Sequence, residues 1–324
     1  MSEDIFDGEF DGTAYEGELS SWVLDKCQEW RDYYEANYSE KHDEYMRLYR
    51  NQWASEDKVR DSERSKLIAP ALAQAVESNV AELEEATFGR GKIFDIRDNY
   101  GDEDGSDIEY LKNKLHDDFE MARIRSSVSE CLINAAVYGT GIGELVIEEK
   151  KVYTPATRPM MEGAMAQVGV EETYRPLIKI NPIQPRNFLI DPNASSVDEA
   201  LGVAIDEFVS RHTVEMLQEQ GVYKDDVHVG DAASDEEIEN DPMIHSRPTG
   251  RVRLLKYYGL VPRSFLLAEG VDEEDMEGDS EYVEAVIVIA NEGTLLKADV
   301  NPYMCQDRPI VAFSWDLVPS TFWG

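Results

Sequence analysis

The spacing of apolar side chains changes once along this chain, at Gly139. Before that glycine, apolar residues recur every three to four positions, which is typical of amphipathic helices packed on a core. After it, apolar and charged residues alternate, as in Gly143–Tyr153, and prolines and glycines separate short apolar runs, which is typical of strands and turns. Helices followed by mostly antiparallel strands predict an α+β fold rather than a wound parallel sheet.

Five helical stretches are expected before Gly139. Serines that can cap a helix start precede the first three, and Gly89 is expected to stop the third. The capping serines are Ser20 or Ser21, Ser39 and Ser65. The five stretches are centred on residues 22–30, 45–53, 72–83, 108–119 and 124–135.

Short strands and turns are expected after Gly139, with one helix among them. A hairpin is expected across Asn291-Glu292-Gly293, because asparagine and glycine tolerate the backbone of tight turns. The expected strands are Gly143–Tyr153, Leu177–Ile180, Asn187–Ile190, Arg251–Leu260, Tyr282–Ala290, Thr294–Ala298 and Pro309–Trp315, and the helix is Thr213–Gln220. The chain is therefore expected to divide into an acidic N-terminal tail, a helical part and a β-rich part, at residues 1–20, 21–140 and 141–324.

The acidic residues are concentrated in four segments. The chain has 67 Asp and Glu against 31 Lys and Arg, a formal net charge of −36. Residues 1–20, 95–109, 231–241 and 269–284 account for −28 of it, so we expect them to be solvated loops or tails. Such a surface repels phosphate, which excludes a protein that wraps DNA with a basic patch. With 42% hydrophobic residues, the chain is also too apolar for an acidic disordered protein.

No motif of a metal site is complete. An EF-hand-like calcium loop around Gly278 would run from Glu273 to Glu284, but its third and fifth ligands, Asp275 and Glu277, are unusual for that loop. The histidines show no HxxxH or HExxH spacing, and the cysteines form no CxxC pair. We therefore expect no metal site, histidines at the surface or in polar contacts, and cysteines that are buried thiols. These residues are His42, His116, His212, His228, His245, Cys27, Cys131 and Cys305.

Two glycine-containing segments resemble phosphate-binding loops but lack the required surroundings. Tyr138-Gly-Thr-Gly-Ile-Gly143 has a helix before it and a strand after it, the reverse of a dinucleotide site, and Glu144 follows it. Gly91-Lys92 lacks the earlier glycine and the following Ser or Thr of a P-loop. We expect the first segment to be a helix stop and a tight turn, and we expect no cofactor.

Glu148-Glu149-Lys150, at the end of an expected strand, is the one hint of an enzyme. An E-x-K triplet ends the core of metal-dependent nucleases, but that core also needs an upstream acid and a basic surface that holds DNA. No Gly-x-Ser-x-Gly elbow for a serine nucleophile is present. We expect no catalytic residues. A metal-dependent nuclease stays as the alternative, and an acidic capsid-associated interaction module is another.

Neither a secretory signal nor a membrane-spanning segment is expected. Met1–Gly12 is acidic and lacks the basic and apolar regions of a signal peptide. The longest apolar stretch, around Val286–Ala290, is far shorter than the roughly 20 residues that span a bilayer. We therefore expect no membrane partner.

Four further stretches acquire meaning when they are taken together. They are Ser65-Lys-Leu-Ile-Ala-Pro70 with Ala75-Val-Glu77, then Asn134-Ala-Ala-Val-Tyr-Gly-Thr-Gly141, then Ile180-Asn-Pro-Ile-Gln-Pro-Arg-Asn-Phe-Leu-Ile-Asp-Pro192 with Ala194 and Asp198-Glu-Ala200, and finally Arg308-Pro-Ile-Val-Ala-Phe313 with Val318-Pro-Ser-Thr-Phe-Trp-Gly324. Their order and spacing over residues 20–324 resemble the portal proteins of tailed bacteriophages, most of all those of short-tailed phages.

The resemblance implies a structural subunit without catalytic residues, metal or cofactor. Portal proteins form a ring, usually a dodecamer, at one vertex of the phage head, and DNA passes through the ring during packaging and ejection without sequence-specific binding. The implied partners are further copies of the chain, the major capsid protein, the terminase motor and the tail adaptor or head-completion proteins. The implied location is the virion, and the host cytoplasm during assembly.

The resemblance also assigns the parts of the chain. It implies that residues 21–140 and 141–324 are the helical and β-rich parts of the peripheral wing. In the family a stem, a clip and often a crown follow the element that begins near Phe322-Trp-Gly324. We therefore expect this sequence to stop near the start of the stem.

Overall fold

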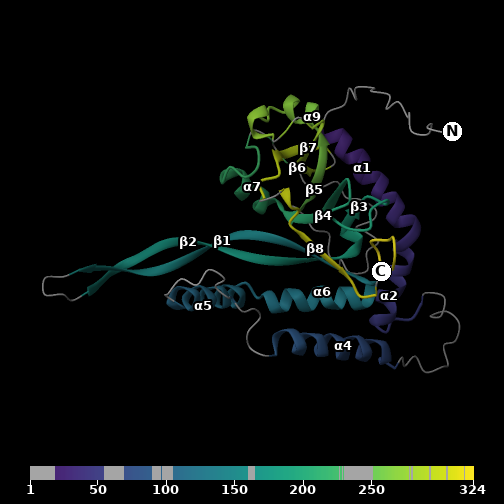
Figure 1. The fold of residues 1–324 in the computed structure, drawn as a ribbon, viewed down its shortest axis with the longest axis horizontal. Coiled ribbons are helices and arrows are strands. Elements are labelled where there is room, and N and C mark those ends of the chain that lie inside the picture. Colours follow the sequence, from purple (N-terminus) through teal and green to yellow (C-terminus); the bar gives the residue numbers. More distant parts are fainter. Residues whose placement is uncertain are drawn as a thin grey trace, which may run out of the picture. The chain divides into compact units, whose positions relative to one another are not determined.

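The structure is a computed structural model of the 324-residue chain (Figure 1). For residues 105–107, 154–159 and 165–168, the backbone alone is described. The residues that the structure describes are 19–54, 69–89, 96, 105–159, 165–225, 227, 229, 251–276, 278, 280–291, 293–303, 306–316 and 318–324.

Some expectations concern residues outside those ranges. The acidic segment 231–241 lies outside them entirely, and so do most of residues 1–20 and 95–109. The same holds for Ser65, Cys305, His228 and His245.

The described residues form two compact units. One unit combines the described part of Met1–Glu29 with Phe208–Val300, and the other combines Trp30–Glu207 with Asn301–Gly324. Helices occur together with antiparallel sheets, so the α+β prediction is confirmed. None of the described helices is long and apolar enough to cross a bilayer.

The first helix is longer than expected. Helix α1 (Leu19–Tyr34) continues through a π-helical turn (Glu35–Ser39) into α2 (Glu40–Tyr49). The predicted cap at Ser20 or Ser21 is wrong, because the buried stripe already starts at Leu19, before the serines. The predicted cap at Ser39 is also wrong, because Ser39 keeps helical angles and makes no capping bond.

The other helices before Gly139 lie where they were predicted, but the expected cap at Ser65 is wrong, because the third helix begins only after Pro70, which is its N-cap residue. They are α4 (Ala71–Phe88), α5 (Gly105–Met121) and α6 (Ile124–Tyr138). Val76, Val80 and Phe88 form the buried stripe of α4, which packs on α6. Helix α4 ends before Gly89 as expected, although that glycine keeps a right-handed backbone instead of the left-handed one typical of a glycine stop.

The unit that combines Trp30–Glu207 with Asn301–Gly324 contains a three-stranded sheet. Its strand order is β2-β1-β8, and it is antiparallel throughout. Its strands are β1 (Thr140–Pro159), β2 (Met165–Ile183) and β8 (Ile310–Ser314). A short antiparallel pair, β3 (Phe188–Ile190) and β4 (Gly202–Ser210), follows a 3-10 turn (Pro185–Asn187). Ala122 and Ile124, at the turn between α5 and α6, pack against Leu177 of β2.

The prediction that β2 is a short piece at Leu177–Ile180 is wrong, because its prolines were taken as strand breaks. In β1, the odd-numbered residues bond toward β8: Leu145 N donates to Pro309 O at 2.7 Å, and Trp315 N donates to Gly139 O. The backbone hydrogen bonds of successive β1 residues point alternately to β8 and to β2, so the even-numbered residues bond toward β2. Pro176 and Pro182 face the odd-numbered residues Glu149 and Gly143, so each lies where its missing N–H would point away from β1. An edge strand tolerates proline at such positions.

In the other unit, the hairpin prediction is confirmed. Strands β5 (Arg251–Pro262), β6 (Tyr282–Ala290) and β7 (Thr294–Val300) pair in succession, all antiparallel. Asn291 takes a left-handed backbone in the β6–β7 turn, and its side-chain oxygen accepts from Arg253 N at 3.1 Å. The core includes Tyr257, which meets Trp22 of α1 edge-on at 6.3 Å.

Two short helices complete this unit. Helix α7 (Arg211–Glu219) matches the predicted helix, and its cap is Ser210, whose hydroxyl accepts from Thr213 N at 3.2 Å. Helix α9 (Arg263–Ala268) was not predicted, because six residues are too few to show a helical period.

Candidate functional site

The helix-to-strand junction at Gly139 is the best-defined local site in the described residues. Helix α6 ends at Tyr138, Gly139 has a φ of +92°, and β1 starts at Thr140. A positive φ is open to glycine and strained for other residues. The interpretation of this glycine segment as a helix stop and a tight turn is therefore confirmed.

The end of the chain returns to this junction. Gly324 N donates to the Thr140 hydroxyl at 2.9 Å, and that hydroxyl donates to Phe322 O at 3.4 Å. A Cβ atom added to Gly139 would lie 2.4 Å from Gly324 O, and one added to Gly324 would lie 2.5 Å from Gly139 O. Each glycine therefore permits the close approach of the other, and we call this pairing the junction contact.

Gly141 and Gly143 allow close packing against β1. A Cβ atom at Gly141 would lie 2.6 Å from Cys131 O of α6 and 2.7 Å from the Phe313 ring of β8. At Gly143 it would lie 2.9 Å from a methyl carbon of Ile180 in β2. These glycines therefore face helix and strand atoms.

The two described cysteines are buried free thiols, as predicted. Burial, followed by the nearby Glu130 carboxylate, raises the pKa of Cys131 to about 11. Its thiol donates to Ile142 O at 3.4 Å. The Cys131 side chain is therefore a protonated core group. Cys27 is also buried, with 3% of its surface exposed.

An aromatic cluster holds the end of the chain in place. Trp323 lies 5.2 Å from Tyr34 and 5.9 Å from His42, measured between ring centroids. A hydrogen bond of 2.8 Å also joins the Tyr34 hydroxyl to Nδ1 of His42. His42 is therefore one of the histidines in polar contacts that the sequence analysis expected. The members of the cluster are Tyr34, Tyr38, His42, Tyr138, Phe188, Phe322 and Trp323.

Acid is expected to weaken the aromatic cluster through His42. Burial, followed by the charge of Lys41, lowers the pKa of His42 from 6.5 to about 4. Between these values the unfolded chain binds a proton that the folded chain does not. The free energy of unfolding therefore falls as the pH drops from about 6.5 toward about 4, by on the order of 2 kcal/mol after allowance for solvent screening.

Urea unfolding at pH 7 and at pH 5 measures this loss. His42→Phe removes the titrating group and should lose less stability over that interval than the unsubstituted chain. His212→Gln, at an exposed histidine of α7, serves as the control and should keep the full loss. Equal losses in all three proteins would contradict the role of His42.

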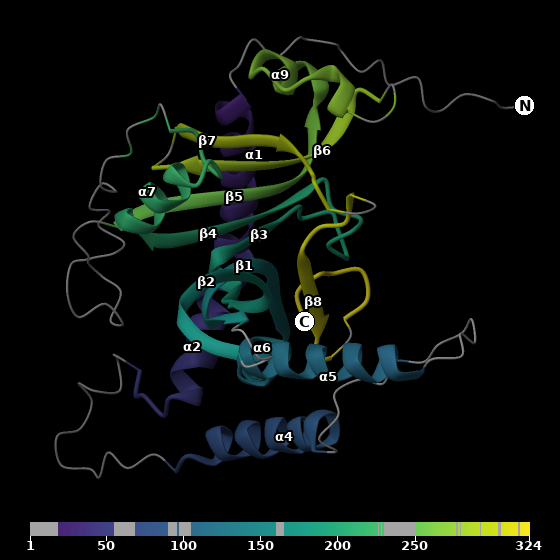
Figure 2. The same ribbon diagram turned by 90° about the vertical axis from the view of Figure 1, so that its left-hand side faces the viewer.

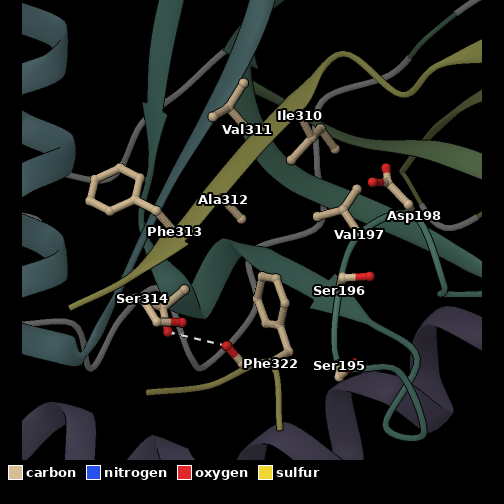
Figure 3. A pocket seen from close by; sticks show the side chains of 11 residues that line it. Ser195, Ser196, Val197, Asp198, Ile310, Val311, Ala312, Phe313, Ser314 and Phe322 are labelled. Carbon is tan, nitrogen blue, oxygen red and sulfur yellow. Dashed lines mark hydrogen bonds between the residues drawn. The ribbon is translucent and has the colours of Figure 1, made fainter. Parts of the chain in front are cut away.

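A pocket of about 330 Å³ lies beside β8 (Figure 3). The loop residues Ser195, Ser196 and Asp198 form one wall, and β8 with Phe322 forms another. Arg308 anchors this loop by donating to Val197 O at 2.6 Å. With Thr140 in its lining as well, the pocket therefore joins three of the four stretches that carried the family resemblance, which lie far apart in the sequence.

The turn that leads into this loop is built around Asp191. Its carboxylate accepts from Asn193 N at 3.0 Å and from Leu201 N at 3.5 Å. The Arg308 guanidinium also donates to Leu201 O, at 3.3 Å. The sequence pointed to a turn at Asp191, whereas the role of Arg308 has no local sequence signal.

The β1–β2 pair continues well beyond the three-stranded sheet. Strand β8 covers only Thr140–Glu144 of β1, so the pair is two-stranded from Leu145 onward, and we call this segment the ribbon (Figure 1). Figure 2 shows its coiled course above α5 and α6. Ion pairs join its strands, between Lys151 and Glu172 at 2.6 Å and between Lys179 and Glu148.

The residues of the nuclease-like triplet and of the calcium-like loop do not form a site in the part of the chain that the structure describes. Glu148 and Lys150 of the nuclease-like triplet lie on the exposed ribbon, where Glu148 is paired with Lys179. Glu273 and Asp275 of the calcium-like loop form a 3-10 turn before β6, while Glu284 is buried within β6. The described residues contain no group of three or more His, Cys, Asp or Glu side chains that could hold a metal ion.

Comparison with known proteins adds the decisive observation. The family model described as Phage SU10 portal protein matches residues 136–324. The match starts in the last turn of α6 and includes the junction contact, the ribbon and the pocket beside β8. The chain belongs to this portal family. No curated protein matches the chain.

Membership of the portal family bears on the sequence predictions. Three of the four stretches that resembled portal proteins lie wholly or largely inside the matched residues, and the stretch from Ser65 lies before them. The portal family is structural rather than enzymatic, and it implies an oligomeric ring, contacts with capsid and tail, and a place at the portal vertex of the virion. For this chain, surfaces for assembly are therefore the relevant sites.

Proposed function

We propose that this chain is the subunit of a dodecameric portal ring through which the phage genome is packaged and ejected. The match of the portal family model to residues 136–324 carries this proposal. The terminase motor docks on the ring during packaging, and tail adaptor or head-completion proteins bind it afterwards. Assembly takes place in the host cytoplasm with the major capsid protein, and the finished ring stays in the virion.

The proposal assigns the chain to the wing of the portal. Residues 21–140 form its helical part, residues 141–324 form its β-rich part, and residues 1–20 precede them as an acidic tail. The helix-to-strand switch at Gly139 supports this division, since α6 and β1 meet there.

The net charge of −36 fits a conduit for DNA. DNA that must slide through a channel has to avoid tight binding, and an acidic surface repels its phosphates over about 8–10 Å at physiological salt. The absence of sequence-specific readout belongs to the same proposal. No catalytic residue, metal or cofactor has a role in it.

Native mass spectrometry and electron microscopy of the purified full-length protein test the proposal. We expect a closed ring of about twelve copies with a central hole, because head-to-tail contacts between identical chains close into rings. A monomer that cleaves DNA when magnesium is added would overturn the proposal in favour of a nuclease. Particles of the full-length protein without a central hole would favour an interaction module.

A further inference from the structure

The ribbon exposes large apolar side chains on one of its two sides. Residues that face each other across an antiparallel pair lie on the same side, and so do residues two positions apart. Leu145 faces Ile180, Ile147 faces Ile178, and the same side continues outward. All exposed large apolar residues described on the ribbon lie on this side, which we call the apolar side: Leu145, Ile147, Tyr153, Val170, Tyr174 and Ile178.

The opposite side has a different character. Leu177 is buried there against Ala122 and Ile124 at the α5–α6 turn, and Arg175 pairs with Asp118 of α5. Farther out, Val152 faces Thr173 on this opposite side, where no large apolar side chain is among the exposed ones described. The unit therefore covers the opposite side of the ribbon with its own helices. On the apolar side Ile180 also packs on this cluster, and Leu145, Ile147 and Ile178 share a pocket with Tyr303 and Pro309, but the six side chains named above stay exposed.

The exposed area is large enough for a specific interface. The six side chains are 36–64% exposed and leave on the order of 700 Å² uncovered, since an aromatic side chain alone has about 150–250 Å². A standard interface buries about 800 Å² on each partner. A two-stranded ribbon is also marginal in water without a further strand or layer on its apolar face. Both facts indicate that another surface covers the apolar side.

The charge of the ribbon indicates which surface that is. Residues 145–183 contain five Lys or Arg and five Asp or Glu, so this segment carries no net charge in a chain of −36. Most of that negative charge lies in the four acidic segments, where two copies of the chain repel each other. The ribbon lies outside those segments, so it can approach a second copy without that repulsion. Its lysines Lys151 and Lys179 are paired within the ribbon, with Glu172 and Glu148.

We infer that the apolar side of the ribbon docks on a neighbouring copy of this chain, as a contact that closes the ring. This inference rests on the proposed function, because the ring supplies the second copy. In a ring, each contact joins two different surfaces of the chain. The ribbon of one subunit therefore lies on another part of its neighbour, and each subunit both gives and receives one ribbon.

A pair of charge insertions tests the inference in the full-length protein. Ile147→Lys with Ile178→Glu places an ion pair across the two strands, which preserves the ribbon while it makes the apolar side polar. Val152→Lys with Thr173→Glu is the matched control on the opposite side. We expect the first variant to need at least a tenfold higher protein concentration to form rings, and the control to assemble like the unsubstituted protein. Equal assembly of both variants, or equal loss in both, would overturn the inference.

Photo-crosslinking separates this inference from the proposed function. A photoreactive side chain at Tyr174, on the apolar side, should link two copies of the chain, whereas one at Thr173, on the opposite side, should not. A dimer linked at Tyr174 in a protein that forms no ring would keep the ribbon contact and overturn the ring. Failure to link two copies at Tyr174, or capture of a different protein there, would overturn the ribbon contact even if rings form.

Discussion

Replacement of Gly139 with alanine is expected to destabilise the protein by about 3–5 kcal/mol, at the upper end of single substitutions. The φ of +92° strains any side chain by about 1–2 kcal/mol. In addition, the new Cβ atom would lie 2.4 Å from Gly324 O, a backbone atom that cannot rotate away. The junction contact must therefore open, and its hydrogen bonds at Thr140 are lost with it.

Comparison with Gly221→Ala separates the clash with Gly324 from the backbone strain. Gly221 has a similar φ of +72°, but no atom lies within 4 Å of its added Cβ atom. Its substitution should therefore cost only the backbone strain, about 1–2 kcal/mol. Urea unfolding of both variants measures the difference, and equal losses would show that the approach of Gly324 to Gly139 contributes nothing.

Truncation of Trp323 to alanine is expected to cost about 3–5 kcal/mol, as for other buried aromatic residues. The indole is 6% exposed and lies 5.0 Å from Phe322 and 5.2 Å from Tyr34, between ring centroids. Its removal leaves a cavity at the centre of the aromatic cluster. The hydrogen bond between Tyr34 and His42 then becomes accessible to water.

Trp53 provides the matched control for Trp323. It is the same residue type in the same unit, but it is 37% exposed and lies after the end of α2. Trp53→Ala should cost less than about 1 kcal/mol. Urea unfolding distinguishes the two variants, and a loss at Trp323 no larger than that at Trp53 would refute the role of the cluster.

The parts of the fold that depend on neighbouring residues could be predicted from the sequence. The β6–β7 hairpin follows from alternating apolar residues and the turn at Asn291, and the helix stop follows from Gly139 after a helical stripe. The prediction was wrong for β2, because whether Pro176 breaks a strand depends on which neighbour its backbone faces. It was also wrong at Ser39, because the helix continues there through a π-helical turn.

The site could be predicted only in part, for the same reason. Gly139 was identified as a helix stop, but its partner Gly324 could not be predicted, since contacts across such a distance in sequence leave no local pattern. The apolar alternation of Leu145 and Ile147 was visible, but it predicts two opposite sides without showing which one α5 and α6 cover. That assignment requires the three-dimensional register.

The junction contact also sets a delay during synthesis. Thr140 and Gly324 are 184 residues apart in the sequence. At about 5–20 residues per second, a ribosome needs roughly 10–40 s to make the second partner after the first. During that time the growing chain has β1 without the backbone that closes over its start, and contacts between such distant residues form slowly. Completion of this unit therefore waits until Gly324 has been made, so another copy of the chain meets the fully folded unit only after translation has passed that residue.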